Sequence, residues 1–117
     1  MFGKVKIGNE EFEMVANAAT AYRFKQVFNR DLLKIFTQSA MTGEADAESI
    51  QMLAFIMIKQ AEKVDFTKVN EDMYVDWLEG LNQFELINAM PKVIELYQKT
   101  EKTSVKQKNG DAQRRES

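Results

Sequence analysis

Residues 2–15 read FGKVKIGNEEFEMV, and this stretch determines the N-terminal part of the fold. Apolar and charged side chains alternate in both halves, and Gly8 and Asn9 form a two-residue loop between them. Alternation gives a strand one apolar and one polar face, and a Gly-Asn pair favours a tight turn. The stretch therefore predicts a β-hairpin with strands over residues 2–7 and 10–15.

One register of this hairpin satisfies the charged and the apolar residues together. It places Ile7 opposite Glu10. The charged face then pairs Lys6 with Glu11 and Lys4 with Glu13, and the other face holds Val5, Ile7, Phe12 and Met14. Because a two-stranded sheet is only marginally stable in water, this apolar face must pack against helices or against another chain.

Two helices are expected directly after the hairpin. Asn17 is a good N-cap for a first helix that begins at Ala18. A second helix is expected from Asp31 to about Ala40, and Gly43 ends it. The second helix is shorter than the first and is expected to bend away from it.

The strongest helix prediction follows Asp46. This residue can cap the helix, Glu48 lies in its first turn and Lys59 in its last, which suits the helix dipole. Its apolar side chains are Ile50, Leu53, Ala54, Phe55, Ile56, Met57, Ile58 and Ala61. Because this band is wide, most of the helix is expected to be enclosed, which makes it the central helix of the fold.

Two further helices are expected in the last part of the domain. Asn70 is the N-cap of the first. The apolar pattern resumes at Phe84 and continues to Tyr97, but Pro91 lies within it. Since proline has no amide hydrogen to donate to the preceding turn, a kink or a short break is expected near Asn88.

The C-terminal end differs from the rest in composition. Residues 1–98 carry 10 basic and 15 acidic side chains, whereas residues 99–117 carry 6 basic and 3 acidic ones. Apolar periodicity ends at about Thr100. We therefore expect a mainly α protein of the α+β type, with the hairpin and four to five helices in one domain over residues 1–100 and a disordered basic tail over residues 101–117.

The composition argues against catalysis and against the common metal sites. The chain has no Cys and no His, so it cannot assemble a structural zinc site of the usual kind or a Cys or His nucleophile–base pair. It contains no P-loop, dinucleotide-binding or G-x-S-x-G motif. We expect no enzymatic activity and no catalytic, cofactor-binding or metal-binding residues. A cleft that gathers several carboxylates would instead support a cryptic enzyme.

Neither a membrane nor a nucleic acid is favoured as the partner. No apolar run approaches the length of a membrane-spanning helix and no signal-peptide pattern occurs, so a soluble cytoplasmic protein is expected. The tail is a candidate for nucleic-acid binding through Lys102, Lys106, Lys108, Arg114 and Arg115. Acidic residues dilute this cluster, no aromatic residue accompanies it, and the body of the chain is acidic, so a solvated or protein-binding tail is favoured.

Large apolar residues supply the candidate contacts with a protein partner. Trp77 is the single Trp of the chain, and aromatic side chains of this kind often anchor interfaces. Its helical phase with Met73 and Leu81 favours a place in the core instead. The candidate set combines the hairpin face with the last two helices: Val5, Ile7, Phe12, Met14, Trp77, Leu81, Phe84 and Met90.

Three segments carry a resemblance to a known family. They are KIGNEEFEMVANAATAYRFKQVFNRDLLK over residues 6–34, ESIQMLAFIMIKQAEK over residues 48–63, and DWLEGLNQFELINAMPKVIELYQKT over residues 76–100. In these segments and in the order of its elements, the chain resembles the phage tail assembly chaperones of long-tailed phages and prophages of Gram-positive bacteria. The resemblance runs from about Lys4 to Thr100.

The resemblance implies a binding function in the host bacterial cytoplasm. A protein of this family coats the tape-measure protein, keeps it soluble, and recruits major tail (tube) protein subunits that then displace it, so it is not expected in the mature virion. It implies no cofactor and no catalytic residue. A free hairpin edge or a groove at the last helix is expected to hold the partner, and the same apolar surface can support self-association. The alternative is a small helical regulatory protein that binds nucleic acid through its basic tail.

Overall fold

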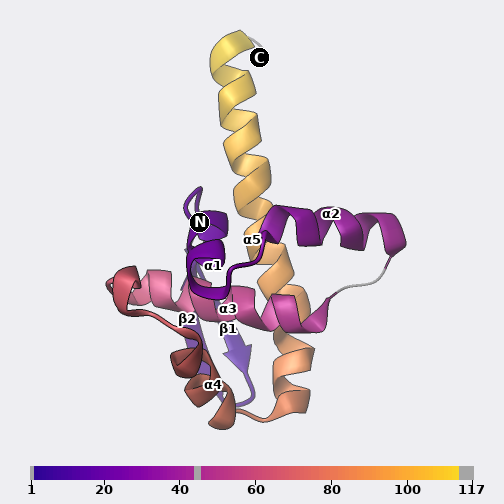
Figure 1. Cartoon of the computed structure of the whole chain (residues 1–117). Helices are drawn as coiled ribbons and strands as arrows, with labels where there is room; N and C mark the ends of the chain where they lie inside the picture. The colour runs from indigo at the N-terminus through magenta and orange to yellow at the C-terminus, as the bar shows by residue number, and fades with distance from the viewer. Residues whose placement is uncertain (1, 44–45, 114–117) are drawn as a thin grey trace.

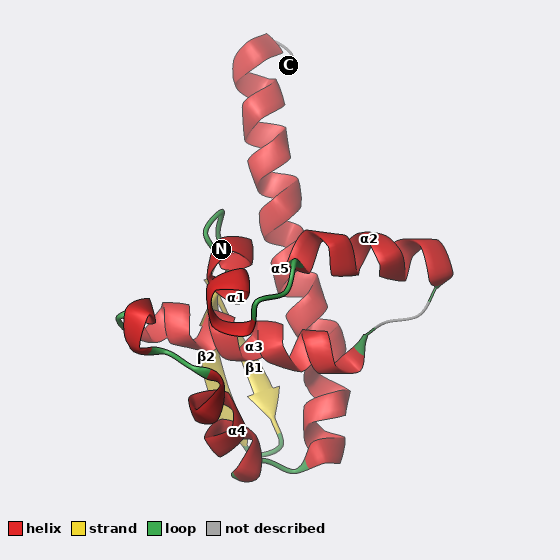
Figure 2. Cartoon of the chain, viewed as in Figure 1, coloured by secondary structure: helices red, strands yellow, loops and turns green. Residues whose placement is uncertain are grey.

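A computed structural model describes residues 2–43 and 46–113 of the chain, and the side chains as far as residue 99. Its elements are β1 (Phe2–Ile7), β2 (Glu10–Val15), α1 (Thr20–Phe28), α2 (Leu32–Thr42), α3 (Ala47–Glu62), the 3-10 turn η1 (Phe66–Lys68), α4 (Glu71–Glu79) and α5 (Gln83–Gln113). Figure 1 shows α5 running past the hairpin and α3, and Figure 2 separates the two strands from the helices. A hairpin followed by five helices confirms the predicted mainly α fold.

The hairpin forms in the predicted register. The cross-strand partners are Phe2 and Val15, Gly3 and Met14, Lys4 and Glu13, Val5 and Phe12, Lys6 and Glu11, and Ile7 and Glu10. Gly8, the first loop residue, has a φ of 66°. A positive φ at this position is the geometry of a type II′ turn, which glycine adopts without strain.

Helices cover the apolar face of the hairpin. α3 packs on β2 and α5 packs on β1. Val5, Ile7 and Met14 are buried in one core together with the apolar residues of α3. The sequence left open whether helices or another chain would cover this face, and helices of the same chain do so.

The predicted central helix is confirmed as α3. Ten of its sixteen residues are buried, and Phe55 is fully so. The ring of Phe55 lies 6.3 Å from that of Phe28, 5.6 Å from that of Tyr74 and 5.8 Å from that of Trp77, measured between centroids. Aromatic pairs at these separations attract beyond their burial of apolar area. Trp77 is therefore partly buried against the core, on the side that its helical phase indicated.

A buried amide ties α3 to the hairpin. The Nε2 atom of Gln60 donates to the carbonyl oxygen of Val15 at 2.6 Å and to Oγ1 of Thr20 at 2.9 Å. Thr20 and Gln60 are both buried. Gln60 therefore fixes the end of β2 and the start of α1 against the central helix.

Two of the three predicted N-caps are confirmed, and the first is wrong. The side chains of Asp46 and Asn70 accept the backbone N–H of Ser49 and Met73, and Asp31 also caps its helix by accepting the N–H of Lys34. Asn17 instead forms a turn before the helix. Its Oδ1 accepts from the N–H of Ala19, and its own N–H donates to Oγ1 of Thr20, both at 2.9 Å. Because these local bonds hold the chain in a turn, α1 begins at Thr20 and not at Ala18.

Pro91 does not break the last helix. α5 continues through Pro91 without interruption, so the short break expected near Asn88 is absent. Pro91 and Asn88 are exposed, whereas Ala89 and Val93 on the adjoining face are buried. The proline costs one backbone hydrogen bond on the solvent side, and the packing of the buried face holds the helix together.

The chain beyond the domain continues α5. The sequence predicted a disordered tail over residues 101–117, and α5 extends as a helix to Gln113. The yellow part of α5 projects away from the other elements in Figure 1. Lys, Glu and Gln are good helix formers, and a helix that is already nucleated extends at little cost. Residues 114–117 lie outside the described part. None of the described helices has the length and apolar content to cross a membrane.

Candidate functional site

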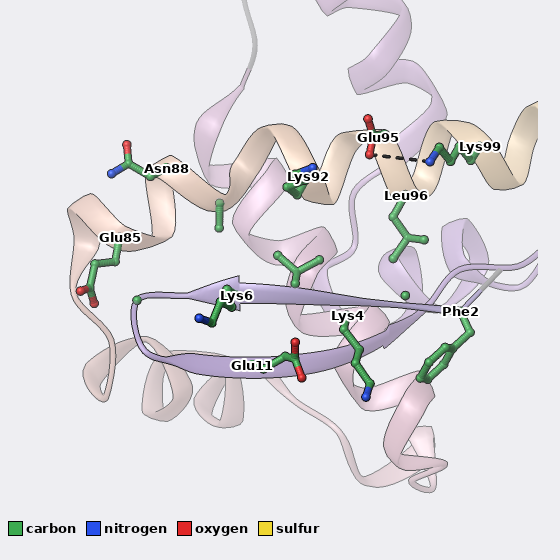
Figure 3. Close-up of a pocket in the computed structure, with 14 residues that line it drawn as sticks. Phe2, Lys4, Lys6, Glu11, Glu85, Asn88, Lys92, Glu95, Leu96 and Lys99 are labelled. Carbon is green, nitrogen blue, oxygen red and sulfur yellow. Dashed lines mark ion pairs between the residues drawn. The ribbon is translucent and has the colours of Figure 1, made fainter.

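A groove of about 650 Å³ lies between strand β1 and helix α5. Figure 3 shows it, with Lys4 and Lys6 on the strand and Asn88, Lys92 and Glu95 along the helix. Its volume falls within the range of about 300–1,000 Å³ that is usual for pockets that bind ligands. This groove is the candidate site.

Two glycines set the position of α5 along the strand. A Cβ atom on Gly3 would lie 3.0 Å from Cδ1 of Leu96, so the missing side chain lets the helix approach. At the other end of the strand, the carboxylate of Glu85 lies so close to Gly8 that a side chain there would overlap it. α5 therefore runs antiparallel to β1, and Glu85 closes the groove at the turn.

One face of α5 forms the helical wall of the groove. Its lining residues recur every three or four positions, which places them on one side of a helix. They are Glu85, Asn88, Ala89, Lys92, Glu95, Leu96 and Lys99. Ala89 and Leu96 are buried at the base, and the polar side chains are exposed. The wall therefore has an apolar base and a polar rim.

The strand wall carries unpaired backbone groups. The turn makes Ile7 and Glu10 a hydrogen-bonded pair, and such pairs alternate along an antiparallel ladder. Val5 and Gly3 therefore bond to β2, whereas the N–H and C=O groups of Lys4 and Lys6 point away from β2 along the free edge. A free edge of this kind can accept another strand.

Three lysines of the groove have no acidic partner. Among the described residues, no carboxylate lies within 4.0 Å of the ammonium groups of Lys4, Lys6 and Lys92. Lys99 differs because it lies 3.8 Å from Glu95 on the same helix. The predicted cross-strand charge pairing thus fixes the register of the hairpin without forming close ion pairs.

The groups with shifted pKa values lie away from the groove. Burial raises the pKa of Asp46, but hydrogen bonds from Ser49 and Arg30 lower it by more, so the net pKa is below 3.8. Burial also raises the pKa of Tyr74, to about 12. Hydrogen bonds from the side chain and backbone of Thr67 lower the pKa of Asp65. In the part of the chain that the structure describes, no three acidic residues gather as a metal site.

Most of the predicted contact residues pack inside the protein. Val5, Ile7 and Met14 lie in the core, and Phe12, Trp77, Leu81 and Met90 are partly buried against it. Phe84 is 77% exposed. Burial within one copy of the chain thus accounts for seven of the eight residues, and Phe84 alone among the eight stays on the surface.

Other exposed apolar residues were not among the predicted contacts. Ile87 lies one turn from Phe84 on α5 and is 41% exposed. On α2, Leu33 and Met41 are 54% and 81% exposed. Figure 1 shows α2 extending from the body of the molecule. Exposed apolar side chains that adjoin one another, as Phe84 and Ile87 do along α5, can mark a contact surface, whereas single ones are common on any protein.

The sequence predicts a free hairpin edge or a groove at the last helix as the partner site, but not that β1 and α5 together line one groove with a polar rim. Its signal was the spacing of Glu85, Asn88, Lys92, Glu95 and Lys99, which repeats at helical intervals. The break expected near Asn88 divided this series in two. A continuous helix through Pro91 would have revealed one polar face over the whole length.

Comparison of the chain with models of known protein families, with curated proteins and with solved structures found no match.

Proposed function

We propose that this protein is a tail assembly chaperone that binds the tape-measure protein in the host bacterial cytoplasm and recruits the major tail (tube) protein. The observation that carries the proposal is the open groove along the free edge of β1, with α5 as its second wall. The resemblance of the sequence supplies the partners. The groove supplies a surface suited to a polypeptide, which supports binding in place of catalysis.

A strand edge suits a partner that must be coated at many positions. Its N–H and C=O groups bind the backbone of another chain, so the contact depends little on the partner's sequence. The helical wall adds side-chain contacts from Lys92 and Leu96. One protein can in this way hold different segments of a long chain.

The exposed apolar side chains support a second contact of the same class. Phe84 and Ile87 lie one turn apart on α5, and Leu33 and Met41 lie on α2. An amphipathic helix of the tape-measure protein can bury its apolar face against such residues. They can also support self-association of the chaperone before the partner binds.

Co-expression tests the proposal. The full chain is produced together with the tape-measure protein encoded by the same phage or prophage, and the tape-measure protein expressed alone is the control. We expect the tape-measure protein to become soluble and to co-purify with the chain, and added major tail protein to release the chain. Failure of both rescue and co-purification would contradict the proposal. Salt-sensitive binding in a DNA mobility-shift titration would favour the nucleic-acid alternative.

A further inference from the structure

Helix α5 lies alongside the free edge of β1. Lys4 and Lys6 direct their N–H and C=O groups away from β2, and no hydrogen bond from another described residue reaches these groups. α5 packs on β1 and forms the other wall of the groove along this edge. A third strand added to β1 would therefore find hydrogen-bonding groups on one side and a helix against its inner face.

A strand added to this edge must have an inner face that is not already covered by helices of its own chain. α3 and α5 already cover the apolar face of the hairpin, so a hairpin from a second copy would carry its own helices into α5. Antiparallel pairing of β1 with β1 of a second copy would also place lysine opposite lysine, which destabilises a sheet. An isolated extended segment of a partner meets neither obstacle.

The charges of the groove define the chemistry of that segment. Residues of an added strand directly opposite Lys4 and Lys6 lie on the same outer face as these lysines. Carboxylates at those positions would pair with ammonium groups that have no acidic partner within 4.0 Å. The residues between them face Ala89 and Leu96 at the base of the groove, which favours apolar side chains. Glu85 at the turn confines the acidic positions to the part of the edge near the lysines.

We propose that the groove binds an extended acidic segment of the partner as a third strand on β1, with Asp or Glu opposite Lys4 and Lys6 and apolar side chains facing α5. For the identity of the partner, a segment of the tape-measure protein, the inference rests on the proposed function. The chemistry of the segment rests on the groove alone. The sequence of β2, EEFEMV, has the required alternation and already pairs with the other edge of β1.

A pair of peptides tests the strand site. The probe is a blocked peptide of sequence EEFEMV, and its control is KKFKMV, each added to the full chain labelled for NMR. We expect EEFEMV to bind about tenfold more tightly, because two cross-strand pairs change from attraction to repulsion in the control. We also expect slower hydrogen exchange at the outward amides of Lys4 and Lys6. Absence of binding, or binding without this protection, would overturn the inference.

Matched variants show whether the lysines of the groove cause the preference for the acidic peptide over the basic one. Lys4→Gln together with Lys6→Gln removes both charges, and Lys34→Gln together with Lys68→Gln removes two exposed charges elsewhere. In the first variant the preference for the acidic peptide should fall from about tenfold to about twofold, with Lys92 supplying the remainder, and in the second it should persist at about tenfold. An equal loss in both variants would mean that net charge is responsible, which would overturn the strand site.

Co-purification separates the two proposals. If the wild-type chain holds the tape-measure protein and the variant Lys4→Gln/Lys6→Gln holds it equally well, the strand site is overturned and the proposed function stands. If the wild-type chain fails to hold the tape-measure protein but adds the acidic peptide to β1, the proposed function is overturned and the strand site stands.

Discussion

Helices α3 and α5 both pack on the hairpin, yet they expose different surfaces. α3 buries ten of its sixteen residues and anchors the hairpin through Gln60. α5 buries one stripe toward the core and presents charged and amide side chains to the groove. The packing of α3 therefore holds the fold, whereas α5 and the edge of β1 form the surface that we propose for a partner. Changes at α3 should lower stability, and changes at the groove should alter binding.

Removal of the central aromatic ring should have the largest effect on stability. Phe55→Ala deletes a fully buried side chain that contacts three other rings. We expect the free energy of unfolding in urea to fall by about 3–5 kcal/mol. Lys92→Ala on α5 is the matched control and should change it by less than about 0.5 kcal/mol. Equal losses in the two variants would remove the distinction between the helices.

The buried amide of α3 should have the next largest effect. Gln60→Ala leaves the carbonyl of Val15 without the side-chain donor and removes one of the two donors to Oγ1 of Thr20. The expected loss is about 1–3 kcal/mol in the same urea titration, because buried polar groups lose a partner. Gln38→Ala, at an exposed position of α2, serves as the control. A loss no larger than that of the control would show that Gln60 does not anchor the hairpin.

The turn that ends the groove should respond more weakly. Gly8→Ala forces an L side chain into a φ of 66° and toward the carboxylate of Glu85. The backbone term alone is about 1–2 kcal/mol. A second variant, Gly8→Ala with Glu85→Ala, keeps this term and removes the overlap, so it should unfold at a higher urea concentration than the single variant. The reverse order would mean that Glu85 does not lie against the turn.

The N-cap of α3 should add a smaller, pH-dependent contribution. Asp46→Ala removes the acceptor for the N–H of Ser49, which costs about 1 kcal/mol at pH 7. The folded-state pKa of Asp46 lies below 3.8, so its stabilisation is present above that value and is lost as the pH falls through the folded pKa. The urea midpoints of the wild type and the variant should converge between pH 5 and strongly acidic pH. A constant difference would contradict this role.

The groove lysines should have the smallest effect on stability. Lys92→Gln changes an exposed side chain without an ion pair among the described residues, so we expect a change below about 0.5 kcal/mol. The variant should nevertheless bind the acidic strand peptide more weakly than the wild type does, as measured by NMR titration. Unchanged binding would show that Lys92 does not contribute to binding in the groove.

Local chemistry was sufficient to predict much of this fold. The loop Gly8-Asn9 and the alternating charges fix the hairpin register without reference to the rest of the chain. Asp46 and Asn70 cap their helices through bonds to residues three positions along. The wide apolar band after Asp46 predicts an enclosed helix because no other arrangement buries it. Each of these features depends on neighbours in the sequence.

The features that were missed depend either on a choice between two local conformations or on packing between distant segments. Asn17 has both helical and turn conformations open to it, and its bonds with Ala19 and Thr20 select the turn. Pro91 is tolerated because α5 is held by residues on its buried face. The groove arises from the placement of α5 beside β1, which no local pattern specifies. The sequence therefore predicts the apolar side of α5 but not which polar residues face the strand.

Hydrogen exchange on the complex shows whether the partner binds along the edge of β1. The full chain is purified with the co-expressed tape-measure protein, and amide exchange is compared with that of the chain alone. If the partner binds along the edge of β1, exchange at Lys4 and Lys6 should slow markedly in the complex. A complex in which these amides exchange as in the free chain, with slowing confined to α2 or to the region of Phe84, would contradict the account.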